Sequence, residues 1–483
     1  MKTTRYAAIL LYGLSVAACG SDGPQTVPTG DTHHNSTIEV GTIVDVLTIE
    51  DRFTNYLGGA LLAGLTPVLD DPDGGPYTLF APTDAAFEQA FVDLGIGDPV
   101  ALISNQALLN ALLRYHIVNG VVWTTDITSP SVTSDTLAGM AVFTHLDGDA
   151  VAVNGGAEAG TTGGAHVEKP DLEALNGVVH IIDRVLLPPD LVSALVYATR
   201  SGNTDLGELT AALEAGGVAS SLRVDLVADD LSALAPLTLL APVDDGFPDT
   251  APPNLTQILK YHVVPGELPR ASLPAHAPTL ATATFGLATP TDLPLTVFFD
   301  VTGDPMVNGG SAGIGANVVT TDIATLNGVV HIVDRAVTPL DAAELVDLAG
   351  LGTFLTALTT SDPIDETPAL QLLADTTPIG VLAPSDAAFD VAFPEGLPGP
   401  RDLSTHLALH LLAPTDAMPT SENLATSPNA STLFGVTATF DVTATPPDVS
   451  LAGGSSANID VADLGATNGV VHLVDAVLTH SAK

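Results

Sequence analysis

The sequence predicts three tandem copies of one domain, each with helices in its first half and a β-sheet in its second. The first observation is a motif, Asn-Gly-Val-Val-His followed by two aliphatic residues and an aspartate, which occurs with its histidine at His180, His331 and His472. The second is the interval between these histidines, which is domain-sized and far longer than a solenoid repeat of roughly 20–50 residues. We therefore expect each copy to bury its own core.

Two further motifs precede the histidine motif in every copy, always in the same order. One is an aliphatic run ending in Ala-Pro-x-Asp, with its aspartate at Asp84, Asp244 and Asp386. The other is an aromatic-histidine pair, Tyr115-His116 in the first copy and Tyr261-His262 in the second, which becomes Leu409-His410 in the third.

These motifs, in this order and three times over, resemble those of the fasciclin domain family. The resemblance covers about residue 39 to the C-terminus. It implies an α+β fold of three tandem fasciclin-like domains, each a bent β-sheet sandwich packed with several α-helices. It also implies a role in adhesion or matrix organisation. We place the domains at residues 39–189, 190–340 and 341–483 and expect each to fold separately.

The first copy illustrates the expected elements. Residues 42–64 carry apolar side chains three and four apart, which predicts two amphipathic helices ending at a glycine. Residues 77–80 predict a strand, after which Asp84, as the cap common to all copies, begins a helix that contains Phe87. Residues 115–122 and 177–186 are rich in β-branched side chains and predict strands. A glycine turn after Asn154, at 308 and 452 in the other copies, predicts a hairpin ahead of the last strand.

The second copy departs from this plan, because Phe247 and His262 are much closer in sequence than Phe87 and His116. We expect a helix to be shortened or missing there. This copy is then expected to be the least stable.

The N-terminal residues 1–18 have the pattern of a secretory signal peptide, with Lys2 and Arg5 ahead of an apolar stretch too short to span a bilayer. The stretch ends in Val-Ala-Ala-Cys19, which resembles a bacterial lipobox, and Cys19 is the single cysteine of the chain. We interpret Cys19 as a lipidation site; an ordinary cleavage site with a stray thiol is the alternative. Residues 19–38 are rich in small and polar side chains and predict a flexible tether. The expected location is the bacterial outer membrane or cell surface.

The composition excludes several function classes. Hydrophobic residues make up 46% of 483 positions, which is enough for several cores. Thirteen Lys and Arg stand against 56 Asp and Glu, a net charge of −43. Nucleic acid is excluded as a partner because phosphate binding needs clustered Lys and Arg. Anionic surfaces are disfavoured unless a divalent cation bridges them.

The repeated side chains are the candidate site residues. The aspartates and the motif histidines, Asp84, Asp244, Asp386, His180, His331 and His472, are interpreted as structural. The family resemblance makes the aromatic-histidine pairs candidates for partner binding, with residues Tyr115, His116, Tyr261, His262 and His410. From the residues alone, an inward-packed tyrosine and a neutral histidine that satisfies a backbone carbonyl are the simpler interpretation.

Three patterns suggest chemistry but fit it poorly. The Gly-x-Ser-x-Gly spacing around Ser311 lies at the glycine turn rather than in a strand-to-helix elbow. His406 and His410 are spaced for a shared metal, yet His406 stands where the other copies have aliphatic residues on an apolar helix face. His33 and His34 lie in the tether, where two flexible ligands seldom suffice. We predict no catalytic residues, no metal and no cofactor.

The sequence thus predicts an exported, lipid-anchored, non-catalytic adhesion or envelope-matrix protein. Its tandem domains are expected to bind a cell-surface or matrix protein or polysaccharide, with membrane contact through the lipid alone. A module that binds a small apolar ligand, such as a carotenoid, is the alternative.

If Cys19 is lipidated, Cys19→Ser is expected to release the protein from the membrane fraction and to abolish incorporation of labelled palmitate. Fractionation and radiolabelling measure both effects. Unchanged retention together with unchanged labelling would contradict the lipoprotein interpretation.

Overall fold

The structure is a computed structural model that describes residues 41–96, 102, 104–128, 132–156, 163–202, 204–226, 228–229, 231, 233–248, 250–288, 292–310, 314–413 and 417–480. The signal segment, Cys19, the tether and Ser311 lie outside the described residues. Copy one forms one compact unit, and copies two and three together form another.

The elements recur from copy to copy. Copy one contains α1 (Ile43–Glu50), α2 (Thr54–Leu62), α3 (Thr66–Leu69), β1 (Tyr77–Pro82), α4 (Asp84–Asp93), α6 (Gln106–Tyr115), β2 (Ile117–Asn119), η2 (Thr124–Asp126), β3 (Val132–Asp135), β4 (Ala141–Asp147), β5 (Ala150–Val153), β6 (Ala165–Ala174) and β7 (Gly177–Ile182). Copy two contains α7 (Leu191–Arg200), α8 (Gly207–Ala215), α9 (Ala219–Leu222), β8 (Leu237–Pro242), η3 (Asp244–Gly246), α10 (Leu255–Tyr261), β9 (Val263–Pro265), η4 (Arg270–Ser272), β10 (His276–Thr284), β11 (Asp292–Asp300), β12 (Met306–Val307), η5 (Asn308–Gly310), β13 (Ala316–Thr325) and β14 (Gly328–Val333). Copy three contains α11 (Ala342–Leu348), α12 (Gly352–Thr360), α13 (Ala369–Ala374), β15 (Ile379–Pro384), α14 (Asp386–Ala392), α15 (Pro400–His410), β16 (Leu411–Ala413), α16 (Ser421–Thr426), β17 (Asn429–Thr432), β18 (Thr437–Asp441), β19 (Asp448–Leu451), β20 (Ser456–Ala466) and β21 (Gly469–Val474).

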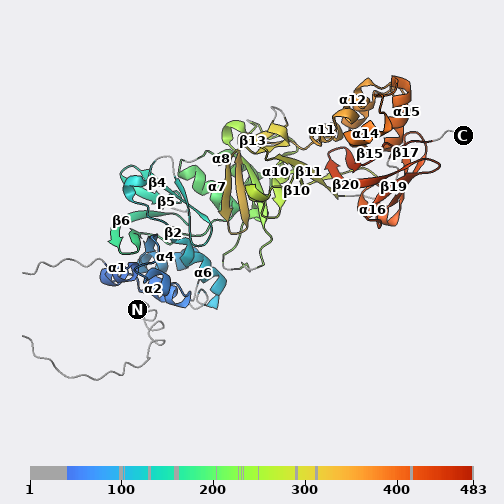
Figure 1. The fold of residues 1–483 in the computed structure, drawn as a ribbon. Helices are drawn as coiled ribbons and strands as arrows, with labels where there is room; N and C mark the ends of the chain where they lie inside the picture. The colour runs from blue at the N-terminus through green and yellow to red at the C-terminus, as the bar shows by residue number, and fades with distance from the viewer. Residues whose placement is uncertain are drawn as a thin grey trace, which may run out of the picture. The chain divides into compact units, whose positions relative to one another are not determined.

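Each copy is an α+β domain built around one strand order. In copy one the order is β2-β1-β7-β6-β5-β4-β3, and copy two repeats it as β9-β8-β14-β13-β12-β11-β10. Copy three has the equivalent pairings, and its β17 also pairs with β16. The two central strands, β1 and β7, run parallel from Tyr77 beside Gly177 to Pro82 beside Ile182, and the other strand pairs of copy one are antiparallel. In copy three, helices α12, α14 and α15 gather on one side of the strands (Figure 1). The central strands are buried almost throughout, as a parallel pair covered on both faces requires.

The predicted helices at the start of copy one are present. Thr42 caps α1 through a capping box with Asp45. The chain leaves α2 through Gly64, whose φ of 69° lies in the left-handed region that favours glycine. The predicted hairpins ahead of the last strand also form, as β5 with β6 and β19 with β20.

Two local predictions were wrong. Residues 115–122 are a strand only from Ile117 to Asn119, because α6 continues through Tyr115. Asp84 does not cap its own helix, since the Thr83 hydroxyl accepts from the Ala86 amide and is the N-cap of α4. A hydroxyl side chain directly before the repeated aspartate is therefore the local signal for the start of this helix.

Copy two has the shortened helical segment that its sequence predicts. In place of α4 and α14 it has the three-residue turn η3, and α10 has seven residues where α6 has ten. The residue before Asp244 is Val243, which has no hydroxyl to cap a helix, and no side-chain cap forms there.

A strand contact joins copies two and three. Leu295 of β11 pairs in parallel with Gly465 of β20, and the Gly465 amide donates to the Thr296 hydroxyl at 2.9 Å. A Cβ at position 465 would lie 2.0 Å from the Pro294 carbonyl oxygen, so only glycine fits. The equivalent positions, judged by their partners in the terminal strand, are Glu173 in copy one and Ala324 in copy two.

The core of copy two extends across this junction. Met418 and Val470 of copy three pack in the same apolar cluster as Leu293 and Leu295 of β11. Separation of copies two and three would expose these side chains.

Within the described residues, no helix is both long and apolar enough to cross a bilayer.

In place of the separate folding of copies two and three expected from the sequence, we expect residues 190–483 to unfold in one cooperative transition, since the two copies share apolar packing. Gly465→Glu is expected to split this transition into two, because the new side chain has no room beside Pro294. Gly303→Ala is the control, since a Cβ there meets nothing within 4 Å. Differential scanning calorimetry measures the transitions. Two transitions in the parent, or one in the Gly465→Glu variant, would show that the junction does not couple the copies.

Candidate functional site

The repeated Asn-Gly pair fastens the first and third helices of each copy to its terminal strand. In copy one the side-chain Oδ1 of Asn176 accepts from the Ile43 amide at 2.9 Å, and the side-chain Nδ2 of Asn176 donates to the Leu69 carbonyl at 2.9 Å. Gly177 is needed because a Cβ would lie 1.9 Å from the Tyr77 carbonyl oxygen. The same contacts are made by Asn327 with Leu191 and Leu222, and by Asn468 with Ala342 and Leu373.

The histidine of the motif, which we call the strand histidine, joins the terminal strand to a loop. His180 on β7 is buried; its Nδ1 accepts from the Asp171 amide at 3.1 Å, and its Nε2 lies 2.8 Å from the Val122 carbonyl oxygen. A backbone amide only donates and a carbonyl only accepts, so the ring must be neutral with its proton on Nε2. His331 (with Asp322 and Leu268) and His472 (with Asp463 and Pro419) repeat the arrangement.

The aspartate that faces the strand histidine, which we call the bulge aspartate, holds the same loop at a second point. Asp171 lies at an irregularity between β6 and β7 and has a φ of 56°. Its carboxylate accepts from the Thr124 amide at 3.0 Å, two residues after the carbonyl that His180 binds. Asp322 binds the Arg270 amide and Asp463 the Ser421 amide in the same way.

A second buried histidine in each copy, the helix-end histidine, closes the domain elsewhere. His116 follows α6, and its Nδ1 lies 2.8 Å from the Leu112 carbonyl oxygen while its Nε2 accepts from the Leu186 amide at 2.9 Å. The proton is therefore on Nδ1, opposite to the strand histidine. His262 binds Ile258 and Val337, and His410 binds Leu382 and Leu478.

The tyrosine beside the helix-end histidine is buried with an asparagine partner. The Tyr115 hydroxyl donates to the Ala141 carbonyl at 2.8 Å and accepts a hydrogen bond from the side-chain Nδ2 of Asn154 at 3.0 Å. Copy two has the same pair in Tyr261 and Asn308. In copy three both members change together, to Leu409 and Ala452, so neither polar group is left in the core without the other.

The repeated aspartate of the Ala-Pro-x-Asp motif caps a helix other than its own. Asp84 accepts from the amides of Thr54 and Asn55, which are the first residues of α2. Asp244 binds the Glu208 amide in α8, and Asp386 binds the Thr353 amide in α12. A carboxylate at a helix N-terminus satisfies free amides and complements the helix dipole, so these contacts give the aspartate a structural explanation in each copy.

Burial lowers the pKa of all six histidines below 6.5. For the helix-end histidines His116, His262 and His410, desolvation lowers the pKa to about 4. For the strand histidines His180, His331 and His472, desolvation also lowers the pKa, while the loop carbonyl and the bulge aspartate act in the opposite direction. All six rings are therefore neutral at physiological pH.

These contacts leave the motif residues little chemistry to offer a ligand. Both nitrogens of His410 are bonded to the backbone, so His410 has no lone pair to share with His406 in a metal site. The His406 ring instead packs edge-on against Phe393, with 5.3 Å between ring centroids. Among the described residues, no cluster of three or more His, Cys, Asp or Glu side chains is arranged to hold a metal ion.

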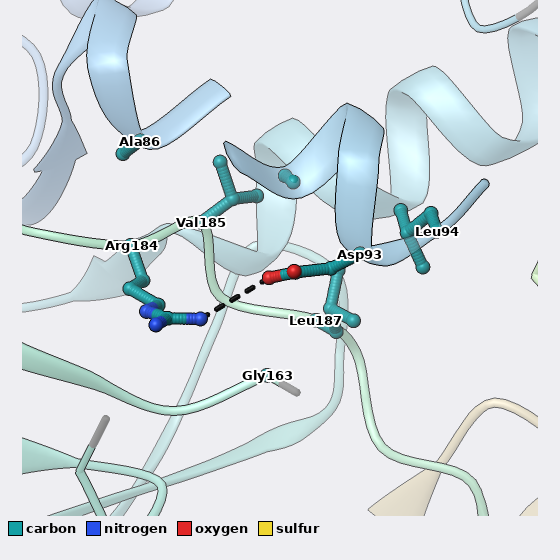
Figure 2. Close-up of a pocket in the computed structure, with 8 residues that line it drawn as sticks. Ala86, Asp93, Leu94, Gly163, Arg184, Val185 and Leu187 are labelled. Carbon is teal, nitrogen blue, oxygen red and sulfur yellow. Dashed lines mark hydrogen bonds and ion pairs between the residues drawn. The ribbon is translucent and has the colours of Figure 1, made fainter. Parts of the chain in front are cut away.

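A cavity in copy one is too small for an apolar ligand. Figure 2 shows it between α4 and the segment that follows β7, where Arg184 and Asp93 form an ion pair of 3.1 Å. Its volume of about 10 Å³ is near the minimum for a single water molecule. A larger cavity, of about 380 Å³, lies at the junction of copies two and three.

Sequence reasoning missed the bulge aspartates and the role of the motif asparagine. The signal was present, because Asp171, Asp322 and Asp463 each stand nine residues before a strand histidine. A search for aspartates at a constant offset from the motif would have found them.

Comparisons with known proteins identify the family of the repeated copies. The sequence profile of the fasciclin domain matches residues 51–188, 204–339 and 349–480. Human periostin is 32% identical over 212 residues, which are 44% of this chain and 22% of periostin. Protein sll1483 of Synechocystis sp. is 34% identical over 148 residues, which are 31% of this chain and 74% of that protein. Among solved structures, a domain pair from the insect cell adhesion molecule Fasciclin I matches with a TM-score of 0.37 and 17% identity, over 60% of this chain and 98% of that one.

We expect His331→Ala to lower the free energy of unfolding by about 1–3 kcal/mol, because the Asp322 amide and the Leu268 carbonyl lose a buried partner. Zinc or calcium is not expected to restore the loss. Urea denaturation measures the loss. His276→Ala is the control and is expected to cost less stability, because His276 on β10 is only half-buried. A His331→Ala variant that is fully stable but has lost partner binding would contradict the structural role and assign this strand to partner recognition.

Acid is expected to destabilise the fold between pH 6.5 and pH 4. An unfolded histidine titrates near 6.5 and a helix-end histidine near 4, so the unfolded state binds more protons in this window and stability is lost as the pH falls. His410→Gln is expected to reduce the pH slope by about one proton. Urea denaturation in about 1 M NaCl, which screens surface carboxylates, measures the slope. Equal slopes for His410→Gln and the parent would contradict the assignment.

Proposed function

Because this chain belongs to the fasciclin domain family, with three copies in tandem, we propose that it is a non-catalytic adhesion or envelope-matrix module. Its partner is a cell-surface or matrix protein or polysaccharide. The protein is exported and held at the bacterial outer membrane or cell surface by a lipid on Cys19.

The observation that carries the proposal is the use of the repeated side chains. The strand and helix-end histidines, Tyr115 and Tyr261 are buried, and their polar atoms bind the backbone of their own copy. The motifs thus serve to build a scaffold three times. Partner recognition is left to exposed residues that differ between the copies.

The exposed surface supplies both apolar and acidic groups for such contacts. Large apolar side chains stand well out of the surface at Ile49, Val92, Val391 and Phe434. The net charge of −43 favours partners that are basic or uncharged.

Three copies on one anchored chain suit a repetitive partner. Once one domain has bound, the others are held near further sites, so weak single contacts combine into strong attachment. A lipid on Cys19 would keep these domains at the envelope, where such a partner is found.

We expect cells that produce the full-length protein to be retained strongly on a surface coated with envelope material from the producing organism. Cells that produce the Cys19→Ser variant, or a truncation to residues 1–189, are expected to be retained less strongly. Loss of the anchor removes the link to the cell, and loss of two copies removes the avidity. Retention under flow measures the effect, and added purified protein is expected to compete. Equal retention of all three strains would contradict an adhesive role.

A further inference from the structure

The junction of copies two and three contains a cleft with a volume of about 380 Å³. This volume falls in the range of ligand sites, which form preferentially where domains meet. One wall comes from β10 and β11 of copy two, and the other from the start of α16 and from β20 of copy three. The lining residues are His276, Pro278, Asp292, Leu293, Pro294, Thr296, Thr420, Glu422, Ala462, Asp463 and Leu464.

The two walls are held in a defined position. The pairing of Leu295 with Gly465 and the hydrogen bond from the Gly465 amide to Thr296 lie beside the cleft. Asp463 is also fixed, because it is the bulge aspartate of copy three and its carboxylate holds the Ser421 amide at 2.9 Å. The cleft is therefore preorganised by the same contacts that build the domain.

The chemistry of the lining changes from floor to rim. Leu293, Thr296 and Leu464 are buried, whereas Asp292 and Glu422 are exposed on opposite walls. Among the described lining residues there are three carboxylates and neither lysine nor arginine. An apolar floor with a carboxylate rim fits a long side chain with an aliphatic stem and a cationic head.

We propose that this cleft binds an arginine side chain presented by a basic peptide segment of the partner protein. The stem packs over Leu293 and Pro294, and the guanidinium faces Asp292 and Glu422. Arginine fits better than lysine because its planar head carries five donors, which serve two carboxylates at once. The inference deepens the proposed function, since it names the chemistry of the partner at one site.

The test is a calorimetric titration of the full-length chain with the peptide Gly-Gly-Arg-Gly-Gly and with its citrulline counterpart, which keeps the shape and lacks the charge. Saturable binding of one arginine peptide per chain is expected, with the citrulline peptide about tenfold weaker or undetectable. The double variant Asp292→Asn and Glu422→Gln is expected to bind about tenfold more weakly than the parent. Ala462→Trp, which fills the cleft without a change of charge, is expected to abolish binding.

The matched control is Asp390→Asn with Glu395→Gln, which removes the same charge from exposed positions of copy three outside the cleft. This control is expected to bind like the parent. Equal weakening in both double variants would show that the overall negative charge, and not the cleft, attracts the peptide. Absence of saturable binding by the parent would overturn the site. Either outcome leaves the retention assay with whole cells unaffected, so failure of the cleft and failure of the adhesive role are distinguishable.

Discussion

Each domain depends on two buried imidazoles that have to stay neutral, because each ring uses both nitrogens on its own backbone. His180 and its equivalents carry the proton on Nε2, and His116 and its equivalents carry it on Nδ1. The first ring fixes a loop to the central strand. The second fixes the end of a helix to the segment that leaves that strand. A second proton on either ring would set an N–H group against a backbone N–H group, so the fold and the protonation state are coupled.

The Asn-Gly pair and the repeated aspartates extend this principle, because each joins segments that are far apart in sequence. Asn176 connects both the start of α1 and the end of α3 to the terminal strand, and Asp84 caps a helix from another part of its copy. The paired change of Tyr and Asn to Leu409 and Ala452 shows that such contacts are kept or replaced as units. Since these residues serve the scaffold, recognition in the proposed adhesive role falls to exposed residues and to the junction between copies.

Much of the fold could be predicted from the sequence, because the repeated motifs mark the same elements three times. The order of the copies and the shortened helical segment of copy two followed from motif spacing, and the terminal strands followed from their β-branched side chains. The partner of Asp84 could not, since the amides of Thr54 and Asn55 reach it only after the chain has folded back. Nor could the cleft, because one of its walls comes from copy two and the other from copy three, although Gly465 in place of Glu173 and Ala324 marks the contact in the sequence.

The central claim is that the six motif histidines are neutral and held in two opposite tautomers. Long-range nitrogen–proton NMR of the imidazole rings distinguishes the tautomers directly. The account predicts Nε2–H rings at His180, His331 and His472 and Nδ1–H rings at His116, His262 and His410, with none of the six titrating at its ordinary pKa of 6.5. A mixture of tautomers at these positions, or titration near pH 6.5 in the folded protein, would contradict it.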